Sequence, residues 1–132
     1  MLTSTAVIAA AAALAAPAAP AGLFDGEVYT ASTSRGSTVV VRNWYWPQYS
    51  RVTIASIPRA DRVAVPPGRT AAQYGVPDAD GVIARPECTT RVVQFDKVTG
   101  STLAFTLAPG WAYKMSGNLR WTVSNTGVNC RG

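Results

Sequence analysis

The side chains best suited to contact a ligand are concentrated between positions 42 and 51. Four aromatic residues are bracketed there by two arginines: Trp44, Tyr45, Trp46 and Tyr49, with Arg42 and Arg51. Flat rings can stack on sugar rings or on a partner's side chains, while Tyr hydroxyl and Arg groups give direction. In an extended strand Trp44 and Trp46 share one face and Tyr45 points to the other, so at least one ring should be accessible. The segment therefore predicts an aromatic ligand-binding patch. The alternative is that both Trp are core residues and the Tyr line a sheet edge.

A second group of residues could bind a cation. Asp78, Asp80 and the following Gly81 have the spacing that opens a calcium loop, and Glu87 stands where a last acidic ligand is expected. Helical flanks are missing, and Val76 occupies the position of the usual first Asp. The alternative, an ordinary Asp/Gly turn without a metal, is the interpretation we favour.

Catalytic chemistry has little support in this composition. The chain has no His, which excludes Ser-His-Asp and Cys-His catalysis and His-ligated zinc or haem. Asp78 and Asp80 could act as a catalytic pair only with a second acidic cluster opposite them across a cleft, and the sequence offers none. Neither a G-x-S-x-G elbow nor an S-x-x-K motif nor a phosphate-binding Gly loop occurs. We expect a protein that is not an enzyme and needs no cofactor.

Cys88 and Cys130 are the only cysteines. A disulfide between them would close a loop of about 40 residues, worth about 4 kcal/mol in the chain-entropy model. It would tie the end of the chain to its middle. The alternative is a pair of buried free thiols in a cytosolic protein. Cys88 follows a carboxylate, which would raise its pKa, so it is not expected to be a nucleophile.

The N-terminal segment has the composition of a secretory signal. Residues 1–21 carry no charged side chain, and residues 6–16 form an unbroken apolar run that is too short to span a bilayer. Small residues end the segment at Ala19 and Ala21, which places cleavage before Gly22. We therefore predict an Ala-rich signal helix at 1–21 and a secreted, extracellular domain at 22–132. The alternatives are an uncleaved anchor or an assembly helix, and the n-region lacks the usual Lys or Arg.

The remaining chain has the pattern of a small all-β domain. It has 132 residues, of which 48% are hydrophobic and 14% charged, so one folded core is expected. Short runs of β-branched and aromatic residues alternate with Gly, Pro, Asn and Asp turns, which predicts an antiparallel sandwich or barrel of seven or eight strands. The expected strands are 27–32, 38–46, 51–57, 62–65, 89–95, 101–108 and 118–124. A hairpin is expected to join the fifth of these to the sixth.

The charge pattern bears on possible partners. The net charge is +5, but it is spread along the chain instead of forming a basic stripe, so we predict no nucleic-acid ligand. Weak attraction to anionic cell surfaces is compatible with this charge. We expect a secreted binding module for carbohydrate, cell-wall polymer or a protein target. The alternatives are a structural subunit of an extracellular or virion assembly and a small secreted hydrolase inhibitor. The sequence predicts no oligomeric state.

Overall fold

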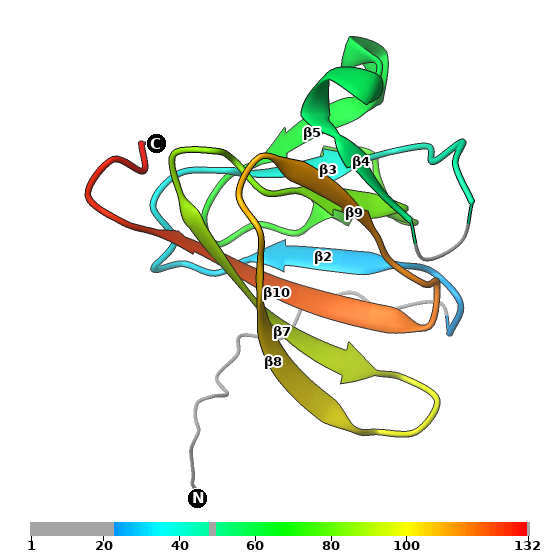
Figure 1. Cartoon of the computed structure of the whole chain (residues 1–132). Coiled ribbons are helices and arrows are strands. Elements are labelled where there is room, and N and C mark those ends of the chain that lie inside the picture. Colours follow the sequence, from blue (N-terminus) through cyan, green and yellow to red (C-terminus); the bar gives the residue numbers. More distant parts are fainter. Residues whose placement is uncertain (1–22, 48–49, 132) are drawn as a thin grey trace, which may run out of the picture.

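The chain folds into two β-sheets, as the sequence predicted for an all-β protein. The computed structural model describes residues 23–47 and 50–131, so the expected signal helix at 1–21 lies outside the described residues. The four-stranded sheet has the order β2 (Glu27–Thr30), β10 (Leu119–Thr126), β7 (Thr89–Asp96), β8 (Thr102–Leu107). The five-stranded sheet has the order β4 (Arg51–Thr53), β9 (Trp111–Lys114), β6 (Gly81–Ile83), β3 (Thr38–Val41), β5 (Arg62–Val65). The first sheet occupies the lower part of Figure 1 and the second the upper part.

Three short 3-10 turns complete the described elements. They are η1 (Ile54–Ser56), η2 (Arg59–Asp61) and η3 (Ala71–Tyr74). Thr70 caps η3 through its side chain, which accepts a hydrogen bond from the Gln73 amide, and the Gln73 side chain accepts one from the Thr70 amide. In the described residues, no helix has the length and hydrophobicity that a membrane crossing requires.

The two sheets share one apolar core. Residues on the facing sides of both sheets pack there, for example Val28, Val92 and Trp121 from the first sheet and Val40 and Val82 from the second. The Trp121 indole is buried, and its Nε1 donates a hydrogen bond of 3.0 Å to Oε1 of Gln94 on the neighbouring strand. The one polar atom of this large ring is therefore satisfied, and its apolar surface contributes to the core.

The best-predicted part of the fold is the C-terminal half of the first sheet. The sequence indicated strands at 89–95 and 101–108, and the structure pairs β7 with β8 in one antiparallel hairpin. Asp96 ends β7, and its carboxylate accepts hydrogen bonds from the amides of Val98 and Thr99 in the connecting turn. The third strand, predicted at 118–124, is β10, which pairs antiparallel with β7 over its full length.

Several strand predictions were wrong in detail. The strand predicted at 38–46 ends at Val41, and the one predicted at 51–57 ends at Thr53, where η1 begins. β6 and β9 were not predicted, so the described strands exceed the expected seven or eight. The sheets are also not wholly antiparallel, because β2 pairs with β10 in parallel. That pairing joins the first described strand to the last, and it is a long-range contact that local patterns do not encode.

The five-stranded sheet buries its outer face as well. Cross-strand neighbours Val39, Ile83, Ala112 and Val52 form one row across it, and they belong to a second apolar cluster with Val41, Ile54 and Ile57. The segment 42–47 and the turn η1 cover this face, since Trp44, Trp46 and Ile54 pack against the cluster. This second core positions the aromatic segment.

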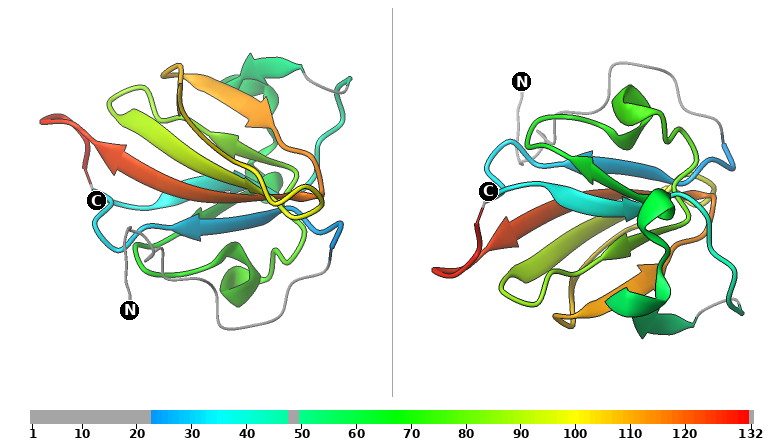
Figure 2. Two further views of the ribbon diagram at one scale, coloured as in Figure 1. Left: turned by 90° about the horizontal axis from the view of Figure 1, so that it is seen from below. Right: turned by 90° about the horizontal axis from the view of Figure 1, so that it is seen from above.

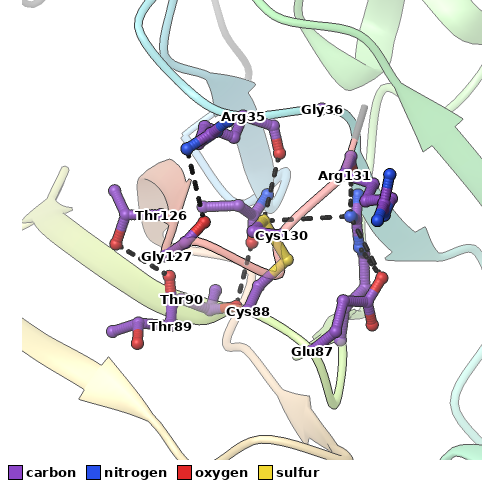
Figure 3. The surroundings of a disulfide bond; sticks show 12 residues. Arg35, Gly36, Glu87, Cys88, Thr89, Thr90, Thr126, Gly127, Cys130 and Arg131 are labelled. Carbon is purple, nitrogen blue, oxygen red and sulfur yellow. Dashed lines mark hydrogen bonds and ion pairs between the residues drawn. A yellow bond between two sulfur atoms is a disulfide. The ribbon is translucent and has the colours of Figure 1, made fainter.

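The predicted disulfide is present. The sulfur atoms of Cys88 and Cys130 are 2.05 Å apart, and both residues are buried. The bond joins the start of β7 to the tail that follows β10, and the backbone carbonyl of Arg35 lies beside it (Figure 3). The two views of Figure 2 show the C-terminal end beside the cyan loop between β2 and β3. Arg35 lies in this loop, and its amide donates a hydrogen bond of 2.8 Å to the carbonyl of Asn125.

Candidate functional site

The aromatic segment lies in a loop and not in a strand. The structure places residues 42–47 after the end of β3, so the strand alternation predicted for Trp44, Tyr45 and Trp46 does not apply. Two acidic residues hold the start of this loop. The Arg42 amide donates to the Asp61 carbonyl at 2.8 Å, and the Trp44 amide donates to Oδ2 of Asp80 at 3.2 Å. The rings are therefore positioned by loop hydrogen bonds and by packing on the second core.

Trp44 is the anchor of the segment. Its ring lies on the backbone of Gly81, and a Cβ at that glycine would come within 3.1 Å of Cε3 and Cζ3 of the ring. Glycine thus leaves the space that the indole fills. The Nε1 atom of Trp44 is buried and has no hydrogen-bond partner among the described residues. Such an unpaired donor costs free energy, so apolar packing must outweigh it.

The other two described rings of the segment build outward from this anchor. The Trp44 and Trp46 rings meet edge to face, with centroids 5.3 Å apart. Tyr45 packs edge to face on Trp46 at 6.0 Å and is 69% exposed. Trp44 and Trp46 are partly buried and pack against the second core, whereas Tyr45 is the exposed ring. The three rings form an arrangement that leads from the buried face of the sheet to solvent.

The two arginines have different environments. Arg42 is exposed. Arg51 begins β4, and its guanidinium carbon lies 4.4 Å from the centroid of the Trp111 ring, which is a cation–π distance. The sequence analysis did not single out Trp111, although its position directly after Pro109 and Gly110 marks the start of a strand. Tyr49 lies outside the described residues.

The three carboxylates of the calcium hypothesis do not come together. Oδ1 of Asp78 accepts a hydrogen bond of 2.8 Å from the Gly26 amide, and Asp80 holds the Trp44 amide. Glu87 lies elsewhere and pairs with Arg85 at 3.2 Å. Within residues 23–47 and 50–131, no three His, Cys, Asp or Glu side chains form a group that could hold a metal ion. Asp78 and Asp80 therefore serve as hydrogen-bond acceptors for two segments that are distant in the sequence.

Asp80 has the clearest electrostatic perturbation near the aromatic segment. Partial burial raises the pKa of its carboxyl, and this effect exceeds the lowering by the Lys114 charge and by the hydrogen bond from Trp44. The fold therefore disfavours the anionic form of Asp80 relative to water, although this carboxylate accepts the hydrogen bond that fixes the Trp44 amide.

Comparisons with known proteins do not identify a relative. No protein-family model matches the chain, and neither curated proteins nor solved structures give a significant match. The functional argument therefore depends on the geometry of the site itself.

Proposed function

We propose that this chain is a secreted, non-enzymatic binding module of sandwich type that recognises a carbohydrate or cell-wall polymer through the segment 42–47. The observation that carries the proposal is the exposed ring of Tyr45, which is backed by Trp46 and, through it, by Trp44 on the second core. A ring supported in this way loses little conformational entropy when a ligand stacks on it.

Sugars suit this surface for two reasons. The C–H face of a pyranose packs on an aromatic ring, and the hydroxyl groups around it need hydrogen-bond donors and acceptors. Tyr45 supplies the ring together with a hydroxyl, and the exposed Arg42 supplies a donor close by in the sequence. Affinity from one exposed ring is modest, so a repeating polymer that offers many equivalent sites is the best-suited ligand.

Export of the protein is supported by two features. The buried Cys88–Cys130 disulfide fits an oxidising compartment, and the composition of residues 1–21 fits a signal peptide. The test is mass spectrometry of the protein recovered from its native host. A mature chain that begins at Gly22 in the extracellular fraction supports export, whereas an intact chain retained in the cytoplasm contradicts it.

The binding proposal is tested by sedimentation with insoluble polysaccharides, including peptidoglycan, cellulose and chitin. Tyr45→Ala is expected to weaken binding about tenfold, which corresponds to about 1.4 kcal/mol. The matched control is Tyr74→Ala, because Tyr74 is also exposed, at 42%, but lies on η3. Both variants should melt at the parent temperature.

Three outcomes would contradict the proposal. The first is absence of binding to every polymer. The second is equal binding by the Tyr45→Ala variant and the parent. The third is equal loss in the Tyr45→Ala and Tyr74→Ala variants. Capture of one defined protein, lost on Tyr45→Ala, would replace the carbohydrate with a protein target at the same surface.

A further inference from the structure

The two sheets have four edge strands, and three of them are protected against pairing with another chain. β2 is covered by the loop before η3. The Thr30 amide donates to the Arg69 carbonyl at 3.0 Å, and the Gly68 amide donates to the Thr30 carbonyl at 2.8 Å. A bridge between Tyr29 and Thr70 adds to this cover. The end of this edge at Thr30 is therefore already paired within the chain.

The edges of the five-stranded sheet are short and charged. β4 has only three residues and begins with Arg51, whose side chain is exposed. β5 has four residues, begins with Arg62 and is followed directly by Pro66. Short length, charge and proline are the usual means by which natural proteins prevent edge-to-edge association.

β8 has none of these protections. It has six residues, Thr102–Leu107, and contains no charge, proline or glycine. Leu103 on this strand is apolar, and it is 57% exposed. Burial increases along this face of the strand, from the exposed Leu103 through the half-buried Phe105 to the buried Leu107, so Leu103 lies at the end that the core does not cover. An uncharged strand with an exposed apolar side chain is the type of edge that pairs with another strand.

The register identifies which backbone groups of β8 are free. The Asp96 amide donates to the Ser101 carbonyl at 2.9 Å, so this pair is hydrogen-bonded. Hydrogen-bonded and non-bonded pairs alternate along an antiparallel ladder. Backbone groups of Thr102, Ala104 and Thr106 therefore point away from β7, and no hydrogen bond reaches them from the part of the chain that the structure describes.

We propose that β8 is a homodimer interface, in which a second copy pairs antiparallel about Ala104 and joins two four-stranded sheets into one. The sequence Thr-Leu-Ala-Phe-Thr from 102 to 106 is nearly symmetric about its centre. Pairing about that centre sets Ala104 opposite Ala104 and Thr102 opposite Thr106 of the second copy. Each hydrogen-bonded pair exchanges two bonds, which gives about six across the interface.

The same register covers the exposed apolar side chain. Leu103 lies opposite Phe105 of the second copy, in a non-bonded pair where side chains are closest. This complementarity favours a second copy over an unrelated peptide, because one strand supplies both halves of every contact. The proteins carry a net charge of +5 each, so they repel at long range. Dimerisation is therefore expected to strengthen as salt is added.

Sedimentation equilibrium of the purified protein tests the proposal. We expect a concentration-dependent equilibrium between monomer and dimer, and Ala104→Lys should weaken the dimer about tenfold or more, since two Lys would face each other at the axis. The matched control is Val128→Lys, which adds the same charge at a residue that is 91% exposed and outside β8. Circular dichroism and melting temperature verify that both variants fold.

A cross-linking pair gives an independent measurement. Ala104→Cys should give a covalent dimer with a short thiol-specific cross-linker, whereas Val128→Cys, which keeps the β8 interface but places its thiol outside it, should not be cross-linked under the same conditions. The proposal is wrong if the parent is monomeric at every concentration. It is also wrong if the Ala104→Lys and Val128→Lys variants dimerise equally well, or if the Ala104→Cys variant gives no covalent dimer. If the protein is a monomer and β8 pairs with an extended segment of another protein, the homodimer proposal is wrong and β8 is the interface for that partner.

Discussion

Replacement of Trp44 by alanine should separate the structural rings of the segment 42–47 from the exposed one. The indole is mostly buried on Gly81 and against Trp46. Removing about 150 Å² of ring surface from the packed state costs about 4 kcal/mol at about 25 cal/mol per Å². The unpaired Nε1 disappears with the ring, which returns about 1–3 kcal/mol. The expected net loss in the free energy of unfolding is therefore about 2 kcal/mol.

Urea unfolding monitored by far-ultraviolet circular dichroism measures this loss, because that signal does not depend on the indole that is removed. About 110 ordered residues have an unfolding entropy of about 0.23 kcal/mol per kelvin, so the melting temperature should fall by about 9 °C. Trp44→Phe should cost less than about 1 kcal/mol, since it keeps an aromatic ring and the loss of packed apolar surface is offset by the loss of the unpaired donor. The surface control Tyr45→Ala should change stability by less than about 0.5 kcal/mol.

The reasoning fails if Trp44→Ala unfolds within about 0.5 kcal/mol of the parent. It also fails if Tyr45→Ala destabilises the domain as much as Trp44→Ala does. Either result would mean that the second core does not extend to the segment 42–47.

Two further predictions concern the rest of the domain. The Cys88→Ala, Cys130→Ala double variant should lose about 4 kcal/mol of stability, seen as a fall of about 17 °C in melting temperature, and a fall below about 4 °C would refute the entropic account. Asp80→Asn should stabilise the domain relative to the parent as pH rises from about 3 to 6. The pKa of Asp80 is raised in the fold, so both states are protonated below the ordinary value of 3.8, and the penalty for the anion develops above it. A pH-independent difference between parent and variant in urea titrations would contradict this assignment.

Local patterns in the sequence were sufficient where a strand and its neighbour are close along the chain. β7, the turn after it and β8 could be predicted because alternating side chains and a Gly100 turn act over a few residues. β6 and β9 could not, because each is only three or four residues long and is defined by its partners on both sides.

The sequence singled out the segment 42–51 as a candidate, but it did not separate the roles of its side chains. Four rings between two arginines identified the segment, yet both the patch and its core alternative remained open. The position of Trp44 depends on Gly81 and Asp80, which lie about 36 residues after it in the sequence. Gly81 packs against the Trp44 ring, and Asp80 accepts a hydrogen bond from the Trp44 amide. A one-dimensional pattern does not specify such a contact, so Tyr45 could not be separated from its neighbours.

The sequence by itself determined the β class, the one cysteine pair that could form a disulfide and the absence of histidine chemistry, because these follow from residue types, their counts and short-range alternation. Only the tertiary structure decided that β2 pairs in parallel with β10, that the Trp44 and Trp46 rings pack half-buried on the second core and that β8 is an edge strand of its sheet in the described residues. These properties depend on which distant segments become neighbours, and that is determined by the packing of the whole chain.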